Sequence, residues 1–262
     1  MAGRRVVRDA LRAEARRVVD ASYAVQAEPA AVEAVHDLRV AVRRLRSVLR
    51  ALRPLARAHA LDELDALLRE LADIVRPVRE LDVLLATLDE FADVMPPDRS
   101  AAIRAPWLDQ LREHRQTLVD VLASGLAHRI DDAALRLRRR HLRRGAGSAG
   151  QRLQPLVRRA MRRLTLATDA PVIADLHQVR ILAKRLRYAA EFADAATGTS
   201  RHASVARRAQ AVQAALGRLQ DLTVLDATIT QQVGDDASLH PLRVRIASAR
   251  AEALHAWRSL GA

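Results

Sequence analysis

Apolar residues along this chain recur mostly at spacings of three and four residues, and the strict alternation of β-strands is absent. Such spacing places apolar side chains on one face of a helix. Most prolines fall at or near the ends of these segments, where a missing N–H is tolerated or ends a helix. We predict an all-α fold with helices over residues 4–26, 30–53, 58–75, 78–92, 98–125, 127–143, 151–168, 172–196, 200–217, 218–232 and 238–260.

One part of this pattern occurs twice. His36 is followed by basic residues at +3, +7, +8 and +10, and His177 is followed by basic residues at the same four positions. The offset is 141 residues (177 − 36), and the segment around Glu80 matches that around Asp221 at the same offset (221 − 80). Two matches at one offset are typical of an internal duplication. We predict two helical halves, residues 1–144 and 151–262, joined by a glycine-rich linker over residues 145–150.

A basic stripe runs beside the apolar seam in each copy. One residue is about 100° of rotation in an α-helix, so residues one position beyond the seam border it and can line a groove. Between Val35 and Arg53 there are six arginines and a single acid, Asp37. Like charges at helical spacing repel, so the pattern predicts an anionic partner. The first stripe comprises His36, Arg39, Arg43, Arg46, Arg50 and Arg53, and the second comprises His177, Arg180, Lys184 and Arg187, ended by Glu191 and Asp194.

The composition narrows the class of partner. The net charge is +13 and the pI is about 11.4, which favours a nucleic acid, an anionic membrane surface or a phosphate polymer. Half of the residues are apolar but only six are aromatic. No cysteine occurs, which excludes disulfides, thiolate metal sites and cysteine nucleophiles. The basic start is not followed by an apolar segment, and no uncharged apolar run is long enough to span a bilayer. We expect a cytoplasmic soluble protein without membrane insertion.

The two copies of His-x-x-Arg-x-x-x-Arg/Lys-Arg-x-Arg, each followed by a Glu/Asp-Leu-x-Val-Leu segment, resemble the CHAD family, the conserved histidine α-helical domain. The resemblance covers nearly the whole chain. It implies two similar four-helix bundles related by a pseudo-twofold axis, with the basic helices facing a central cavity. It also implies binding of inorganic polyphosphate and association with polyphosphate granules. In the second motif the family favours Gly-x-x-Arg-Asp, whereas this chain has Arg76 and Glu80 in one copy and Gly217, Gln220 and Asp221 in the other.

The resemblance assigns ligand contacts to the basic residues of both motifs. Arginine suits phosphate because its planar fork engages two oxygens at once, and one basic side chain per helical turn of about 5.4 Å tracks a linear anion. The two histidines would donate to phosphate when protonated, near pH 6.5 if unperturbed. The predicted polyphosphate-binding residues are His36, Arg39, Arg43, Arg44, Arg46, Arg50, His177, Arg180, Lys184, Arg185 and Arg187.

Two other functions remain as alternatives. Binding of double-stranded nucleic acid is the nearest, because charge alone does not separate phosphate polymers; single-strand binding would need aromatic stacking platforms, and no aromatic is interleaved with the stripes. A metal enzyme is the second, since Glu33 with His36 and Glu252 with His255 have the Glu-x-x-His spacing of di-iron bundles. Arg39 would repel the cation, and no phosphate-binding glycine loop or nucleophile elbow occurs. We expect no catalytic residues, no metal and no cofactor.

Overall fold

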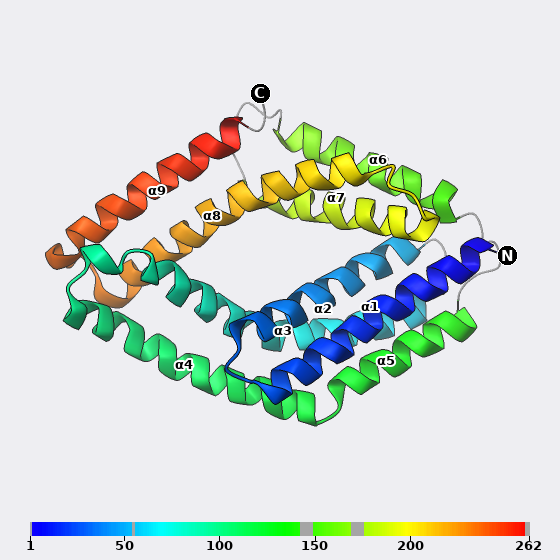
Figure 1. The fold of residues 1–262 in the computed structure, drawn as a ribbon, viewed down its shortest axis with the longest axis horizontal. Coiled ribbons are helices and arrows are strands. Elements are labelled where there is room, and N and C mark those ends of the chain that lie inside the picture. The colour runs from blue at the N-terminus through cyan, green and yellow to red at the C-terminus, as the bar shows by residue number, and fades with distance from the viewer. Residues whose placement is uncertain (1, 54–55, 142–148, 169–175, 260–262) are drawn as a thin grey trace.

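The computed structural model describes all residues except 1, 54–55, 142–148, 169–175 and 260–262, and within the described ranges it contains helices and no strand. The predicted all-α fold is therefore confirmed (Figure 1). Short turns η2 (Ala92–Val94), η3 (Leu137–His141) and η5 (Ala237–Leu239) connect longer elements. The helices are α1 (Ala2–Ala27), α2 (Val32–Leu52), α3 (Ala58–Asp89), α4 (Pro97–Ala123), α5 (Leu126–Arg136), α6 (Ala149–Thr168), α7 (Leu176–Thr197), α8 (Ala203–Val233) and α9 (His240–Ser259).

The order of elements repeats along the chain. Helices α1 to α3, the turn η2 and α4 are followed, after α5, by α6 to α8, the turn η5 and α9. The two basic stripes lie at corresponding places, on α2 and α7. This order agrees with an internal duplication, although the duplication and the pseudo-twofold axis stay predictions. Of the predicted linker, residues 145–148 lie outside the described residues, and 149–150 already belong to α6.

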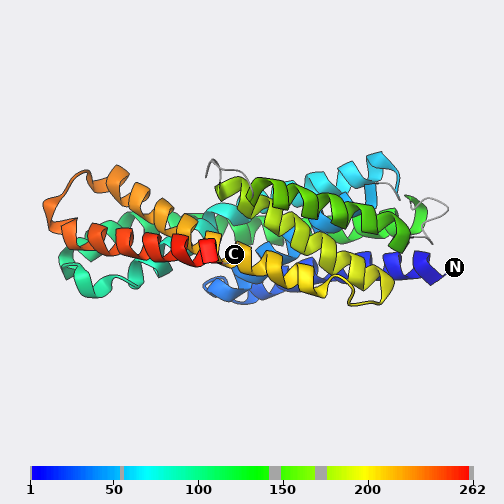
Figure 2. The same ribbon diagram turned by 90° about the horizontal axis from the view of Figure 1, so that it is seen from above.

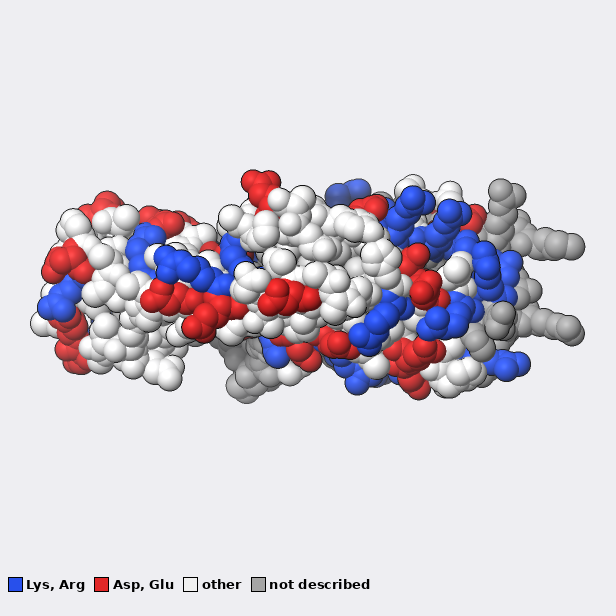
Figure 3. All heavy atoms as spheres, turned by 90° about the horizontal axis from the view of Figure 1, so that it is seen from below, with Lys and Arg blue, Asp and Glu red and all other residues white. Residues whose placement is uncertain are grey.

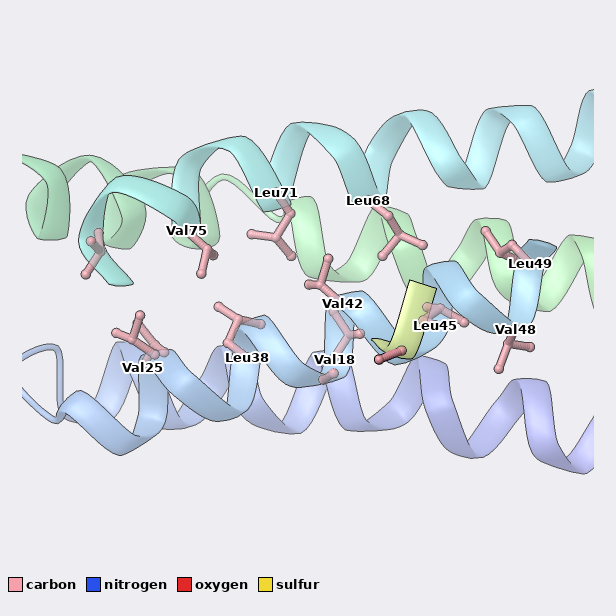
Figure 4. Packing of buried hydrophobic residues seen from close by; sticks show 14 of the residues in the cluster. Val18, Val25, Leu38, Val42, Leu45, Val48, Leu49, Leu68, Leu71 and Val75 are labelled. Carbon is pink, nitrogen blue, oxygen red and sulfur yellow. The ribbon is translucent and has the colours of Figure 1, made fainter. Parts of the chain in front are cut away.

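The core of the N-terminal half is built from aliphatic side chains on both sides of α2. In Figure 4, apolar side chains of α2 point toward α3, while α1 packs on the opposite side. Burying an aliphatic side chain of this size contributes roughly 1.5–3 kcal/mol, so the seam fixes how α2 is rotated and where its basic stripe points. The labelled residues are Val18 and Val25 of α1, Leu38, Val42, Leu45, Val48 and Leu49 of α2, and Leu68, Leu71 and Val75 of α3.

The helix boundary predicted at Pro77 is wrong, because α3 continues through this proline to Asp89. Proline removes one backbone hydrogen bond, to the carbonyl four residues earlier. That residue is the exposed Asp73, where water can satisfy the carbonyl, and Val75 and Val78 on either side of the proline are fully buried. Tertiary packing therefore holds the helix together across Pro77. The boundary predicted between residues 217 and 218 is also wrong, since α8 runs uninterrupted through Gly217.

The two halves meet along helices that include α2 and α7, which carry the two basic stripes. α7 packs against α1 and α2, while α8 packs against α3 and α4. The body is elongated, with the turn into α9 at one end and the N-terminus at the other (Figure 2). Ion pairs between Arg218 and Glu90, at 2.6 Å, and between Arg245 and Asp93, at 3.4 Å, also join the halves. This arrangement sets the basic face of α2 opposite that of α7. None of the described helices is apolar over a stretch long enough to cross a bilayer.

Candidate functional site

Five basic side chains from three helices lie within electrostatic reach of one another where the two halves meet. α2 supplies Arg39 and Arg43, α3 supplies Arg79, and α7 supplies Arg180 and Lys184. We call these five residues the central cluster. All five are half-buried. Asp221 of α8 faces the cluster, and the exposed Glu80 of α3 acts on Arg39 from its rim. Among the described residues, no carboxylate oxygen lies within 4.0 Å of any of the five cations.

The crowding of positive charge changes the ionisation of the cluster. Burial, followed by the charges of Arg180, Arg43 and Arg39, lowers the pKa of Lys184 to about 7. Burial and then Arg43 lower the pKa of Arg39, and burial is also the main cause of the lowered pKa of Arg43. Burial raises the pKa of Asp221 against the opposing effect of Arg180. A folded protein that retains such unpaired, partly desolvated cations has a site suited to an anion.

The hydrogen-bond donors of the cluster also indicate a site for an anion. The Nε atoms of Arg43 and Arg180 are buried and have no acceptor among the described protein atoms. Buried donors are nearly always satisfied in proteins, and an oxyanion between α2 and α7 would supply the acceptors. Tyr188, which is buried, orients two of the arginines from below: the guanidinium carbon of Arg43 lies 5.2 Å and that of Arg187 lies 5.6 Å from its ring centre.

Three of the predicted site residues are held by carboxylates instead. Arg187 donates from Nε to Glu191 at 2.7 Å, and Arg44 lies 3.5 Å from both Glu191 and Glu14. Arg46 donates to Asp65 at 3.0 Å. An arginine with a close carboxylate has less to gain from a phosphate than one without, because the ligand must compete with that partner. Arg44, Arg46 and Arg187 therefore lie around the cluster rather than in it.

The remaining predicted residues lie outside the central cluster. His36 is half-buried, and burial followed by the charge of Arg79 lowers its pKa. His177 and Arg185 are exposed on α7. Arg50 is also exposed, although enough protein surrounds its guanidinium for desolvation, followed by Arg185 and Arg46, to lower its pKa. The structure thus brings Arg39, Arg43, Arg180 and Lys184 together, and the histidines are not equivalent.

Two residues of the site, Arg79 and Tyr188, were not among the predicted site residues. Arg79 precedes Glu80 in the repeated segment, so its place one turn beyond Arg76 on α3 could have marked it as a member of the site. Tyr188 follows directly on Arg187, at the end of the second stripe, and its contacts correct the expectation that the aromatics stand apart from the basic residues. It is buried beneath the arginines, so it is no stacking platform for nucleotide bases.

Some basic residues elsewhere on the described surface pair with acids, whereas exposed arginines such as Arg159 and Arg163 of α6 have no carboxylate within 4.0 Å among the described residues. Figure 3 shows the face seen from below, where acidic side chains are interspersed with the basic ones. On α5 of the first half, Arg136 pairs with Glu63 at 2.6 Å and Arg129 with Glu70 at 3.6 Å. The partial burial of its five cations distinguishes the central cluster from these exposed arginines.

The pattern that raised a di-iron site is not assembled into one. Glu33 and His36 lie on α2, and Glu252 and His255 lie on α9, which packs along α8. In the part of the chain that the structure describes, no three histidine, aspartate or glutamate side chains form a possible metal site.

Comparisons with known proteins agree with this architecture. The family model for the CHAD domain matches residues 4–230. Among solved structures, the chain is similar to PptA from Streptomyces chartreusis, with a TM-score of 0.68 and 23% identity over 98% of both chains. It is also similar to the CHAD domain from the plant Ricinus communis, with a TM-score of 0.65 and 24% identity over 97% of this chain and 86% of that one. No curated protein matches. Because the family model spans most of its length, the chain belongs to the CHAD domain family.

Proposed function

We propose that this protein binds inorganic polyphosphate at the central cluster, in the cytoplasm and in association with polyphosphate granules. Membership of the CHAD family is consistent with polyphosphate binding. The observation that carries the proposal is the gathering of five half-buried cations from both halves without a carboxylate among the described residues within 4.0 Å. Non-bridging phosphate oxygens, which carry the negative charge of the polymer, would accept from Arg43 and Arg180 and relieve the repulsion between α2 and α7.

The partial burial of the cluster favours a thin, flexible polyanion over duplex DNA. A linear phosphate chain can enter between two helices, whereas a duplex presents its phosphates on a wide rigid cylinder. No exposed aromatic adjoins the cluster to stack on a base, since Tyr188 is buried. The role we propose is binding without hydrolysis, in which the arginines and the lysine of the cluster act as hydrogen-bond donors to the anion.

A competition titration distinguishes polyphosphate from the nucleic-acid alternative. Labelled long-chain polyphosphate bound to the protein is displaced by unlabelled polyphosphate or by duplex DNA, at physiological salt and at equal concentrations of phosphate. We expect polyphosphate to compete at roughly tenfold lower concentration, a difference of about 1.4 kcal/mol. Displacement by DNA at equal or lower concentration would instead assign the site to nucleic acid.

Polyphosphate affinity is expected to fall as the pH rises above 7. The pKa of Lys184 in the free protein is about 7, and a neighbouring phosphate raises it. Between the two pKa values the complex binds one more proton than the free protein, so binding is favoured by acid and weakens by up to about tenfold per pH unit. Below pH 7 the lysine is protonated in both states, so its contribution becomes constant.

We therefore attribute the change of affinity near neutral pH to the ionisation of Lys184 and not to that of His36. His36 titrates below its ordinary value because burial and Arg79 lower its pKa, so it adds affinity only at lower pH. Titrations from pH 6 to 9 with Lys184→Arg are the check, because arginine keeps its charge over this range. The variant should bind with a flat profile above pH 7. A slope equal to that of the unaltered protein would show that another group takes up the proton.

A further inference from the structure

The two basic stripes, although related by one sequence offset, end differently in the structure. On α2 the stripe continues from Arg43 to Arg46 and Arg50, whereas the positions corresponding to Arg46 and Arg50 on α7 are Arg187 and Glu191. Glu191 is not a free acid: it accepts from Arg187 at 2.7 Å and lies 3.5 Å from Arg44. The α7 side of the cluster is therefore closed by an acid that already binds the last arginine of its stripe.

The helices that follow α2 and α7, namely α3 and α8, also differ in the basic residues that they carry. Arg76 of α3 corresponds to Gly217 of α8, again at the offset of 141 residues (217 − 76). Gly217 lacks the side chain that would project from α8, and the guanidinium of Arg180 lies against this position, 3.8 Å from where a Cβ would stand. On the α7/α8 side, the guanidinium of Arg180 thus lies over α8 at Gly217, and no basic side chain takes the place that Arg76 has on α3.

On the α2/α3 side a groove remains open. It has a volume of about 270 Å³ and begins at two residues of the central cluster, Arg39 and Arg43. Apolar side chains line part of the groove, together with Arg46, which Asp65 holds at 3.0 Å, and Arg76, which pairs with Asp73 at 3.1 Å where both side chains are exposed. Arg50 has no carboxylate within 4.0 Å among the described residues, and Arg185 of α7 lies near enough to lower its pKa. Because an exposed ion pair contributes little, Arg76 as well as Arg50 remains available to a phosphate. From residue 39 to residue 50 the helix rises by roughly 16 Å, which is long enough for a chain of several phosphoryl units. The remaining lining residues are Val42, Arg46, Arg50, Ala72, Asp73, Val75 and Arg76.

We propose that a polyphosphate chain leaves the central cluster in one direction only, along the groove between α2 and α3, so that Arg50 and Arg76 select for long chains over short ones. The inference rests on the proposed function. A short oligophosphate is satisfied by the central cluster, while a longer chain gains Arg50 and Arg76 as well. On the other side, Glu191 stands in place of Arg50 and holds Arg187 through its Nε at 2.7 Å, with both side chains largely buried, so α7 offers the chain fewer available cations.

The test compares tripolyphosphate with long-chain polyphosphate by calorimetric titration of the whole protein. Arg50→Gln with Arg76→Gln is expected to lower affinity for the long chain about tenfold, equivalent to the loss of roughly one charge-assisted contact, and to leave that for tripolyphosphate nearly unchanged. Both residues are exposed, so the fold should tolerate the change. The matched control, Arg159→Gln with Arg163→Gln, removes the same charge from the exposed face of α6.

The outcomes separate the inference from the function on which it rests. Equal losses for both ligands, or equal losses in the control variant, would overturn the one-directional groove while leaving the central cluster in place. If the unaltered protein binds neither phosphate, the proposed function itself fails. A loss confined to long chains and to the groove variant supports the inference.

Discussion

Replacing Arg43 and Lys184 together with glutamate is expected to lower polyphosphate affinity by at least about a thousandfold. Each lost charge-assisted contact is worth roughly 1.5–3 kcal/mol, so two of them contribute about 3–6 kcal/mol against the about 4 kcal/mol that a thousandfold change requires. The new carboxylates would also repel the ligand. We expect the helical content to be retained, because the glutamates would replace mutual repulsion with attraction to Arg39 and Arg180. Equilibrium titration and circular dichroism measure the two effects separately.

The control for this prediction changes the net charge by the same amount on α6, a helix that supplies no residue of the central cluster. Arg159→Glu with Arg163→Glu converts two exposed arginines of α6, and both double variants lower the net charge of +13 by four. Its affinity should decline modestly, through long-range attraction alone. If both double variants lose affinity equally, diffuse charge rather than the central cluster binds the polymer.

In the protein without a ligand, packing of the two halves changes the ionisation of groups in and around the central cluster. Lys184 is partly neutral at pH 7 and burial raises the pKa of Asp221, so folding suppresses part of the charge that the site would otherwise carry. A phosphate chain restores the charged form of Lys184, and binding and protonation are therefore linked. Natural proteins keep such local conflicts mainly where they serve function.

Much of the architecture could be predicted from the sequence because helical periodicity is a local signal. The seam of α2 is buried, with Leu38 and Leu45 fully inaccessible to solvent, and the stripe one position further borders the cluster through Arg39 and Arg43. The same logic failed at Pro77, where buried valines on both sides outweigh the break that proline alone would favour. Local propensity yields to tertiary packing at such points.

Which basic residues of the motif belong to the central cluster could not be predicted from their spacing in the sequence. Arg44 occurs in the motif like the others, yet it lies 3.5 Å from Glu191, a contact between helices far apart in the chain, whereas Arg187 binds the same acid within its own helix. The pKa of Lys184 likewise depends on cations from α2 as well as its own helix. Ion pairs and desolvation between distant segments arise only when the halves pack together, so sequence defined the stripe and the structure selected the cluster within it.

The chemistry of Lys184 gives the second large effect, because this is the single lysine of the chain. A pKa of about 7 leaves roughly half of the amine unprotonated at neutral pH, which makes it far more nucleophilic than an ordinary lysine. Acetic anhydride should therefore acetylate Lys184 readily in the free protein. A phosphate chain in the cluster would protonate the amine and shield it, and each unit by which the pKa rises reduces the reactive form about tenfold.

Protection of Lys184 from acetylation is the most direct measurement of where polyphosphate binds. Peptide mass spectrometry follows the acetylation of Lys184 at pH 7, with the α-amino group of the chain as the internal reference. Saturating long-chain polyphosphate is predicted to slow acetylation of Lys184 by about tenfold or more and to leave the reference unchanged. Undiminished acetylation of Lys184, at concentrations where titration shows the protein saturated, would contradict binding at the central cluster.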